Sequence, residues 1–375
     1  MTNYILLSFV LFFSFSQDTY AQKNSKVICT QEVYINESLS FLKKDSVLKT
    51  LSKRSDLIVG HPTMQGFEVY GDDNLFKILD ELKISYSTKN FSEKNTLTYK
   101  GHPSFDEIES KLKTLNEDFE DIMTLESIGK SIEGRDIWLM RIEEKTEKNR
   151  SDKKHIFYIA NMHGDEITGR ELMVMLIEDL GDRYKNNDVE ILNLLDQRVI
   201  HILPSMNPDG AERRRRTNAK RVDLNRDFPD WTRGNENSLE GREPEVQAVM
   251  KYFNKYDFIF SANFHGGAQV VNYPWDNSPE EGDLERVLKQ ISFDYIANGA
   301  DYMKSSFFPS GVTRGYDWYP VYGGLQDWST HYHDSPHITI ELSDTKWPHF
   351  DDMSYFYENN KNSLIKAMGS LSPAR

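Results

Sequence analysis

The sequence predicts an α/β fold in which a mixed, largely parallel β-sheet is flanked by helices on both faces and preceded by a small α+β domain. Two observations support this expectation. After residue 104, short apolar runs alternate with longer amphipathic segments, which is the pattern of strands buried on both faces and of covering helices. Before residue 91, shorter strand-like and helix-like segments form a separate group.

The first residues have the pattern of an export signal. The stretch from Tyr4 to Phe15 is apolar but too short to span a bilayer, and Thr19-Tyr20-Ala21 provides small residues before a cleavage site at Gln22. No Lys or Arg precedes this stretch, so an uncleaved anchor is the alternative interpretation. We expect residues 1–21 to be a cleaved signal peptide, which predicts a secreted or periplasmic protein with no membrane span in its mature chain.

The small domain is expected to cover residues 22–90. Its strands are predicted at 33–35, 67–70 and 84–86, and its helices at 39–51 and 75–82. The segment from Ser87 to Tyr99 is polar, rich in lysine and aperiodic, which places a linker at 91–101. The large domain then occupies residues 102–375.

The large domain begins with a clear helix signature. Ser104 and Glu107 have the spacing of a capping box, and apolar residues follow at helical spacing from Phe105 to Phe119. Beyond this helix, buried strands are predicted at 156–160, 199–203, 258–261 and 338–342, and helices at 167–180, 243–256, 284–303 and 355–370.

Charge and cysteine content exclude several classes of function. The chain has 375 residues, and 45 Lys and Arg against 59 Asp and Glu give a formal net charge of −14. Nucleic-acid binding depends on phosphate neutralisation, so we expect no nucleic-acid partner. The run Arg213–Arg216 could bind heparin or nucleic acid, but a solvated loop with one functional arginine is favoured. The single cysteine, Cys29, excludes an intramolecular disulfide and metal sites of several thiolates, and we interpret it as passive rather than reactive.

Unusual polar residues follow each of the four predicted strands. They are Asn161-Met162-His163-Gly164-Asp165-Glu166 after the first, Asn207-Pro208-Asp209-Gly210 and Asp223-Leu224-Asn225-Arg226 after the second, Asn263-Phe264-His265 after the third, and Glu341 at the end of the fourth. Because ligands of open α/β sheets bind beyond the carboxyl ends of the strands, we expect these residues to converge.

The residue types in this group suit a catalytic metal. His163 and Glu166 are three residues apart at a strand-to-helix turn, and His265 can supply a third ligand. Two histidines, one glutamate and an open position for water form a catalytic zinc set, so we expect one Zn²⁺ per chain. Asp223 could accept the other ring N–H of a ligating histidine. The alternative, isolated core histidines and helix caps, is disfavoured because all four strands lead into such residues.

Taken in order, these motifs resemble the zinc metallocarboxypeptidases, most closely the branch that contains carboxypeptidases N, E, M and D. The resemblance extends over about residues 99–348 and includes His265-Gly266-Gly267 and Ile340-Glu341-Leu342. It implies a zinc carboxypeptidase-like sheet and a secreted exopeptidase that hydrolyses the C-terminal peptide bond of peptides or proteins.

The resemblance also implies roles for individual residues. His163, Glu166 and His265 would bind zinc. Glu341 would be the general base that takes a proton from zinc-bound water and later delivers it to the leaving amine. Arg216 would polarise the scissile carbonyl and stabilise the oxyanion. These roles agree with the residues' chemistry, because zinc acidifies its bound water and a nearby glutamate can move the proton.

Five further residues would contact the substrate. Asn225 and Arg226 would clamp the terminal carboxylate, for which a fork-shaped guanidinium is suited. Tyr319 resembles a mobile tyrosine that closes over bound substrate. In this branch an aspartate at the position of Asp276 selects Arg or Lys, and Gln326 would lie in the same pocket. The alternative interpretation of Asp276 is a turn cap before Asn277-Ser278-Pro279.

Two departures from this branch affect the interpretation. The branch usually adds a transthyretin-like β-sandwich, whereas 34 residues follow Glu341 here, enough for the helix at 355–370. Residues 22–90 resemble, more weakly, the propeptide domain of the pancreatic-type branch, and this domain would cover the cleft until the linker is cut.

Alternative functions remain at this point. A cell-wall peptidase of the same fold would cleave a D-configured or γ-linked residue, and a catalytically inactive chain would only bind peptides. His331, His333 and His337 could form a second metal cluster, but they lack a carboxylate partner in helical register and we interpret them as structural. The oligomeric state is not predicted.

Overall fold

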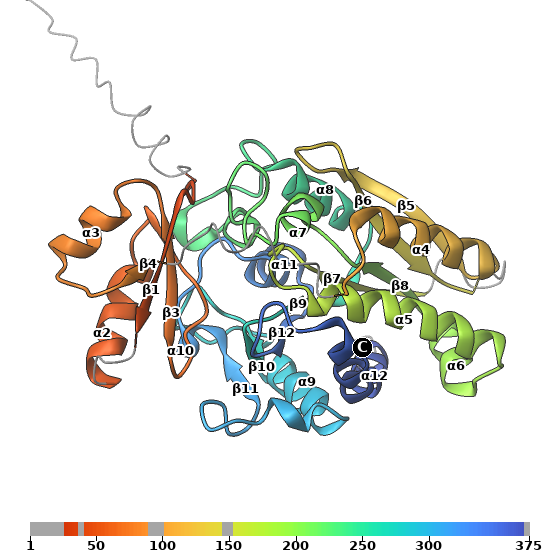
Figure 1. The fold of residues 1–375 in the computed structure, drawn as a ribbon. Coiled ribbons are helices and arrows are strands. Elements are labelled where there is room, and N and C mark those ends of the chain that lie inside the picture. The colour runs from red at the N-terminus through yellow and green to blue at the C-terminus, as the bar shows by residue number, and fades with distance from the viewer. Residues whose placement is uncertain (1–25, 37–40, 89–100, 145–152, 371–375) are drawn as a thin grey trace, which may run out of the picture.

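The computed structural model describes residues 26–36, 41–88, 101–144 and 153–370, which form a small and a large unit (Figure 1). The predicted signal peptide and most of the predicted linker lie outside these residues. None of the helices in the described ranges is long and apolar enough to cross a bilayer.

The small unit is an antiparallel sheet with two helices. Its strands are β1 (Gln31–Asn36), β2 (Leu57–Val59), β3 (Gly66–Gly71) and β4 (Ser87–Thr88), in the order β2-β3-β1-β4, and its helices are α2 (Phe41–Ser52) and α3 (Leu75–Glu81). The strand predicted at 84–86 is displaced to β4. The N–H of Ile84 bonds back to the Leu79 carbonyl after a left-handed turn at Lys83, so pairing with β1 begins only at Ser87.

The large sheet of the described chain has the order β11-β10-β12-β9-β7-β8-β6-β5. The strands are β5 (Met123–Lys130), β6 (Asp136–Ile142), β7 (Lys154–Ala160), β8 (Arg198–Leu203), β9 (Phe258–His265), β10 (Ala268–Tyr273), β11 (Val312–Arg314) and β12 (His337–Ser343). The central pairs β12–β9, β9–β7 and β7–β8 and the edge pair β10–β11 are parallel, whereas β10–β12, β6–β8 and β5–β6 are antiparallel. The prediction of a mixed, largely parallel sheet is therefore confirmed.

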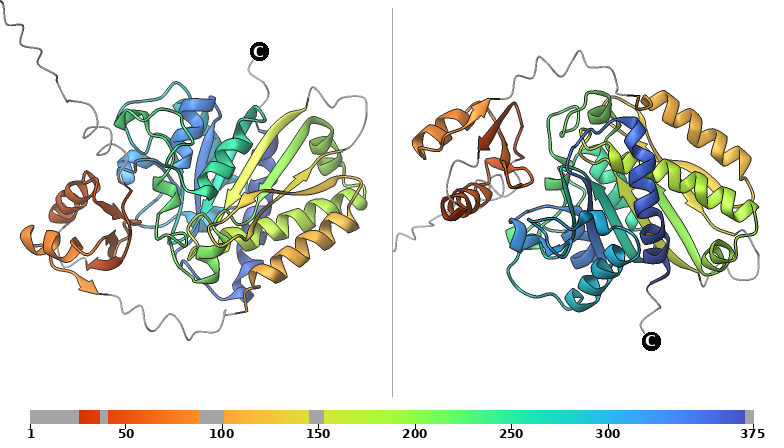
Figure 2. Two further views of the ribbon diagram at one scale, coloured as in Figure 1. Left: turned by 90° about the horizontal axis from the view of Figure 1, so that it is seen from above. Right: turned by 60° about the horizontal axis from the view of Figure 1, so that its bottom comes forward.

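Helices cover both faces of this sheet (Figures 1 and 2). One face carries α4 (Phe105–Asp118), α5 (Thr168–Lys185), α6 (Val189–Gln197), α9 (Glu285–Ala297) and α12 (Met353–Gly369), and the other carries α8 (Pro244–Phe253) and α11 (Leu325–His333). Along β7, Ile156 and Tyr158 pack into the first apolar cluster, while Phe157 and Ile159 pack into the second. This alternation explains why the central strands are continuous apolar runs.

Sequence signals set several helix ends. The capping box of Ser104 and Glu107 is present at the start of α4, as predicted. The helix predicted at 284–303 is too long, because α9 ends at Ala297 and the chain turns at Gly299 with φ of +151° before a 3₁₀ turn at Asp301–Met303. A φ in that range favours glycine and interrupts a helix.

The small unit packs against the large unit near the carboxyl ends of the central strands (Figure 2). Its apolar core continues into Val270 of β10 and into Trp318 and Tyr319, which lie in and just after the short helix α10 (Gly315–Trp318). Polar contacts also join the units, including an ion pair of 2.6 Å between Lys346 Nζ and Glu68 Oε2. The contact between the two units therefore lies directly beside the polar residues that follow the central strands.

Candidate active site

The three predicted metal ligands meet at the ends of neighbouring strands. His163 and Glu166 lie in the loop between β7 and α5, and His265 is the last residue of β9. Nδ1 of His163 lies 2.9 Å and Nδ1 of His265 lies 2.7 Å from Glu166 Oε2, and the two nitrogens are 3.1 Å apart. All three side chains are buried.

These donors fit a zinc ion. In a tetrahedral site with metal–ligand bonds of about 2.0–2.1 Å, ligand atoms lie about 3.3 Å apart, close to the observed spacing. Burial disfavours the charged form of Glu166, but the neighbouring His163 and His265 outweigh it and hold the pKa of this carboxyl well below its usual range. Burial lowers the pKa of His265, which favours the neutral imidazole that binds metals. His163, Glu166 and His265 would therefore hold the ion.

The ligands are oriented by a layer of buried polar groups. His163 Nε2 lies 3.1 Å from Asp223 Oδ1, and Arg216 Nε donates to Asp223 Oδ2 at 2.8 Å. Burial would raise the pKa of Asp223, but the charge of Arg216 outweighs it, so this pKa lies well below its usual range. Asn263 Nδ2 lies 3.0 Å from His265 Nε2. Asp223 was singled out in the sequence, whereas Asn263 was noted only as part of a motif, without a role.

Glu341 faces the metal ligands from β12. It stands directly opposite His265 in the parallel pairing of β12 with β9. Burial, followed by the negative charge of Glu166, raises the pKa of Glu341 well above its usual range. Glu341 Oε2 is buried and has no hydrogen-bond partner among the described residues. A carboxyl group with these properties can exchange a proton with a reactant at the metal.

A fourth histidine reaches this cluster from the small unit. His61 lies in the loop between β2 and β3, and its ring stacks on Trp318 with a centroid distance of 5.6 Å. Its Nε2 lies 3.1 Å from Glu341 Oε1, and its Nδ1 lies 3.9 Å from Glu166 Oε1. Sequence reasoning missed His61, since the segment Gly60-His61-Pro62 has no spacing to another ligand that would mark it.

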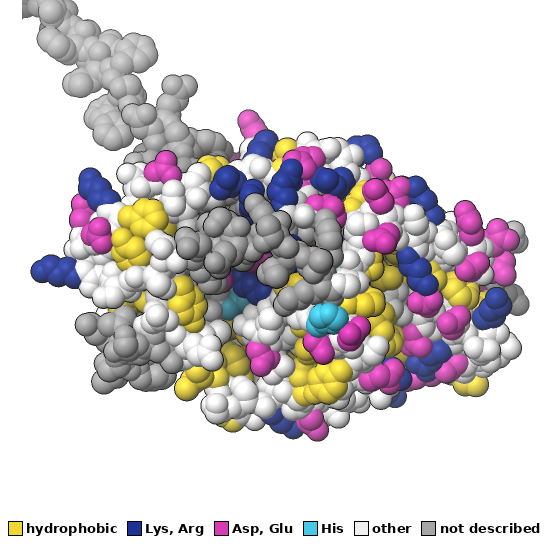
Figure 3. Space-filling view, in the orientation of Figure 1, with side chains coloured by type: hydrophobic (Ala, Val, Ile, Leu, Met, Phe, Trp, Pro, Cys, Tyr) yellow, Lys and Arg dark blue, Asp and Glu magenta, His cyan; other side chains and the backbone are white. Residues whose placement is uncertain are grey.

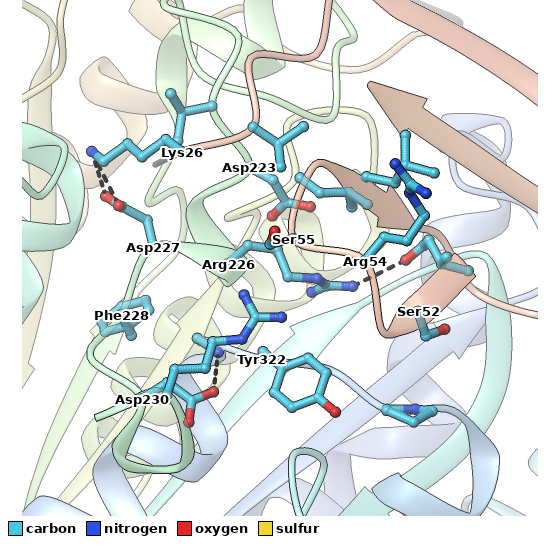
Figure 4. A pocket seen from close by; sticks show the side chains of 18 of the residues that line it. Lys26, Ser52, Arg54, Ser55, Asp223, Arg226, Asp227, Phe228, Asp230 and Tyr322 are labelled. Atoms are coloured by element: carbon cyan, nitrogen blue, oxygen red, sulfur yellow. Dashed lines mark hydrogen bonds and ion pairs between the residues drawn. The ribbon is translucent and has the colours of Figure 1, made fainter. Parts of the chain in front are cut away.

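The predicted carboxylate clamp lies at the boundary of the two units. Asn225 and Arg226 belong to a 3₁₀ turn, and Arg226 Nη2 donates to the Val59 carbonyl of β2 at 3.1 Å. Figure 4 shows the Arg226 guanidinium pointing into a pocket of about 90 Å³ that residues of both units line. In the same view Lys26 pairs with Asp227 at 3.0 Å.

Asp276 and Gln326, the predicted specificity residues, form a buried hydrogen-bonded pair. Gln326 Nε2 donates to Asp276 Oδ1 at 2.7 Å. Burial raises the pKa of Asp276 to about 7, although Arg226 and Gln326 oppose this shift. Two neighbours were not found from the sequence. Asp327 accepts the Asp276 N–H at 3.0 Å, and a Cβ on Gly315 would lie 1.4 Å from Asp276 Oδ1, so only glycine leaves room for this carboxylate.

Tyr319 and Arg216 complete the predicted set. Tyr319 is buried between the units, with its ring centroid 6.3 Å from that of His61. Burial raises the pKa of the Tyr319 hydroxyl. Arg216 Nη1 lies 3.3 Å from Glu166 Oε1, and its Nη2 is buried without a hydrogen-bond partner in the described part of the chain. This guanidinium therefore has a free donor beside the metal ligands.

Three of the four arginines in the run 213–216 are paired, stacked on an aromatic ring or buried. Arg213 pairs with Glu133, Arg214 lies over the Trp347 ring at 4.8 Å, and Arg216 is buried. Figure 3 shows basic and acidic side chains interspersed on the visible face.

The three histidines set aside in the sequence make separate contacts. His331 stacks on Trp231, His333 packs on Trp328, and His337 Nδ1 contacts Ser261 Oγ at 2.7 Å.

Comparison with known proteins identifies related chains. Residues 108–363 match the zinc carboxypeptidase family. The chain is 37% identical to carboxypeptidase M of Mus musculus over 283 residues, which are 69% of this chain and 63% of that protein. It is 34% identical to carboxypeptidase SOL1 of Arabidopsis thaliana over 278 residues, which are 72% of this chain and 56% of that protein.

Both matches cover less than two thirds of the relatives' own length. Among solved structures, carboxypeptidase A from Helicoverpa armigera superposes with a TM-score of 0.70 at 17% identity, over 93% of this chain and 100% of that chain. At this low identity the similarity concerns the fold.

Proposed function

This chain belongs to the zinc carboxypeptidase family, and from that premise we propose that it is a secreted or periplasmic zinc exopeptidase that releases C-terminal residues, preferably Arg and Lys, from peptides. The observation that supports the activity most directly is the convergence of His163, Glu166 and His265 with Glu341 at the ends of neighbouring strands. The predicted signal peptide supports the location.

Substrate would be positioned by its terminal carboxylate. The guanidinium of Arg226 can form two parallel hydrogen bonds to a carboxylate, and Asn225 lies beside it in the same turn. Fixing the free carboxylate places the adjacent peptide bond over the metal ligands, which restricts hydrolysis to the last residue. Tyr319, beside the same cleft, would cover the bound residue.

The chemical step would divide between the metal and three side chains. When bound, zinc supplies a Lewis acid that acidifies water and polarises the scissile carbonyl. Glu341 takes a proton from the attacking water and later gives it to the departing amine. The free donor of Arg216 stabilises the negative charge that develops on the carbonyl oxygen. Asp223 holds both His163 and Arg216 in place.

The preference for basic residues rests on Asp276. Its buried carboxylate can pair with a cationic side chain, and Gln326 fixes its orientation through the bond of 2.7 Å. An aspartate held in a low-dielectric pocket favours a charged partner strongly over an apolar one, because an apolar side chain would leave the carboxylate unpaired.

We further propose that residues 22–90 act as an inhibitory propeptide that is released when the linker at 91–101 is cut. The Val59 carbonyl occupies the Arg226 donor that a substrate carboxylate would need. Trp318 Nε1 donates to the Pro62 carbonyl at 3.0 Å, so the loop of the small unit lies across the cleft. This arrangement supports the proposal that the intact chain is inactive until the linker is cut.

The test uses matched peptides ending in Arg, Lys, Leu or Phe and zinc-loaded protein, intact or cut in the linker, with and without a chelator. We expect chelator-sensitive release of Arg and Lys after the cut. Release of Leu or Phe would retain the mechanism and refute the basic preference. No release by the cut protein would favour a cell-wall peptidase or a peptide-binding module. Equal turnover by intact protein, verified by mass spectrometry, would refute the propeptide proposal.

A further inference from the structure

We propose that His61 is a fourth ligand of the metal, which closes the metal site while the small unit is docked. The proposal rests on the zinc-dependent function argued above and concerns its regulation. Catalytic zinc sites keep three protein ligands and one open position, whereas structural sites have four protein ligands. A histidine from a separable unit would convert the first kind of site into the second.

The position of His61 Nδ1 supports the assignment of this residue as a metal ligand. One potential ligand atom each from His61, His163, Glu166 and His265 lies within 4.8 Å of the other three, and all four side chains are buried. Nδ1 of His61 has no hydrogen-bond partner among the residues that the structure describes. A buried ring nitrogen without a partner is costly unless something else binds it, and a metal ion held by the other three residues would do so.

The opposite edge of the same ring contacts the general base. Nε2 of His61 lies 3.1 Å from Glu341 Oε1, and Nδ1 faces Glu166 at 3.9 Å. An attacking water needs both a place at the metal and contact with Glu341. The imidazole of His61 spans these two partners, so it would exclude that water and would occupy the proton acceptor.

Neighbouring contacts hold the His61 ring in this position. The ring stacks on Trp318, and the indole N–H of Trp318 donates to the carbonyl of Pro62, the next residue. Two residues before His61, the Val59 carbonyl accepts from Arg226. The segment 59–62 therefore contacts the clamp, the base and the metal ligands together, and a ligand fixed on both sides loses little entropy on binding.

A cysteine at position 61 provides a spectroscopic test in the full chain loaded with Co²⁺. A thiolate bound to Co²⁺ produces a strong near-ultraviolet charge-transfer absorption that histidine and glutamate ligands do not. We expect His61→Cys to show this absorption. The wild-type chain is the control, because its own thiol, Cys29, is buried and contacts the Val27 carbonyl at 4.0 Å instead.

Metal retention provides a second measurement. Competition with a chelator should show a Co²⁺ affinity at least about 10-fold weaker in full-length His61→Ala than in wild type, since even outer-sphere partners of ligands change affinity by 10–100-fold. Gln65→Ala alters an exposed side chain of the same loop and should behave as wild type. Thermal unfolding of each variant establishes that it is folded.

The outcomes separate this proposal from the proposed function. Absence of the charge-transfer absorption in folded His61→Cys, together with wild-type retention in His61→Ala, would refute the fourth ligand while leaving a three-ligand zinc enzyme intact. Failure of the wild-type chain to bind Co²⁺ at all would refute the proposed function itself.

Discussion

The two sides of the cleft differ in how the chain builds them. On the large unit, His265 and Glu341 lie on parallel strands of one sheet and His163 lies in the loop that follows a third, so their positions follow from the pairing of β7, β9 and β12. On the small unit, Val59 and His61 belong to a strand end and a loop that meet the site only because two units dock. The first side is part of one folded core, whereas the second belongs to a separate four-stranded sheet.

The contrast between the two sides of the cleft is tested most strongly by removing the proposed general base, Glu341, which belongs to the large unit. Glu341→Gln keeps the size of the side chain but cannot accept a proton, so kcat of the cut enzyme should fall by about 10²–10⁴-fold. Zinc content and peptide binding should remain close to wild type, because Glu341 is not one of the three ligands from the large unit. Assays of released Arg and metal analysis measure both. Wild-type turnover would refute the assignment of the base.

The second prediction concerns the layer behind the ligands. Asp223→Asn removes the charge that faces both His163 and Arg216, and metal affinity should fall by about 10–100-fold. Chelator competition on the cut enzyme measures this loss. Asp209→Asn is a matched control, since Asp209 is also buried but its carboxylate bonds to Arg135 at 2.6 Å and to Ser131 at 2.8 Å rather than to a histidine of the site. An equal loss in both variants would indicate general destabilisation instead.

The third prediction uses the raised pKa of Asp276. Burial raises this pKa to about 7, so the carboxyl is largely neutral below pH 7 and ionised above it. Binding of a cationic side chain requires the ionised form, so the preference for Arg over Leu in kcat/KM should fall by about 10-fold for each pH unit below 7. Because kcat/KM for the Arg substrate is divided by kcat/KM for the Leu substrate, the titration of groups that affect both substrates cancels. A ratio that does not change with pH would refute the role of Asp276.

The contrast between the two sides of the cleft also explains which parts of the molecule could be predicted from the sequence. The strands, the covering helices and the large-unit ligands were foreseeable, because strand periodicity is local and the carboxyl ends of parallel strands meet at one edge. The motifs around His163 and His265 therefore indicated one site even though 102 residues separate them.

The remaining parts depend on contacts between distant segments. His61 stands alone in a loop, and no local pattern shows that its unit docks on the cleft. Gly315 resembles any other glycine until the carboxylate of Asp276 is placed 1.4 Å from its missing Cβ. The displaced strand at Ser87 likewise depends on the turn at Lys83, whose left-handed conformation is uncommon for a lysine.

An ion pair across the boundary between the two units gives the smallest expected effect. Lys346 pairs with Glu68 of the small unit at 2.6 Å, and it keeps a second carboxylate partner on the large unit, Asp165 at 3.4 Å, when Glu68 loses its charge. Glu68→Gln should weaken docking by at most about 1 kcal/mol, which raises the basal turnover of the intact chain by no more than about fivefold. Glu81→Gln is the control, because its pair with Lys77 lies on the exposed surface of the same unit. A much larger increase would mean that this ion pair, rather than the segment at the metal, holds the small unit on the cleft.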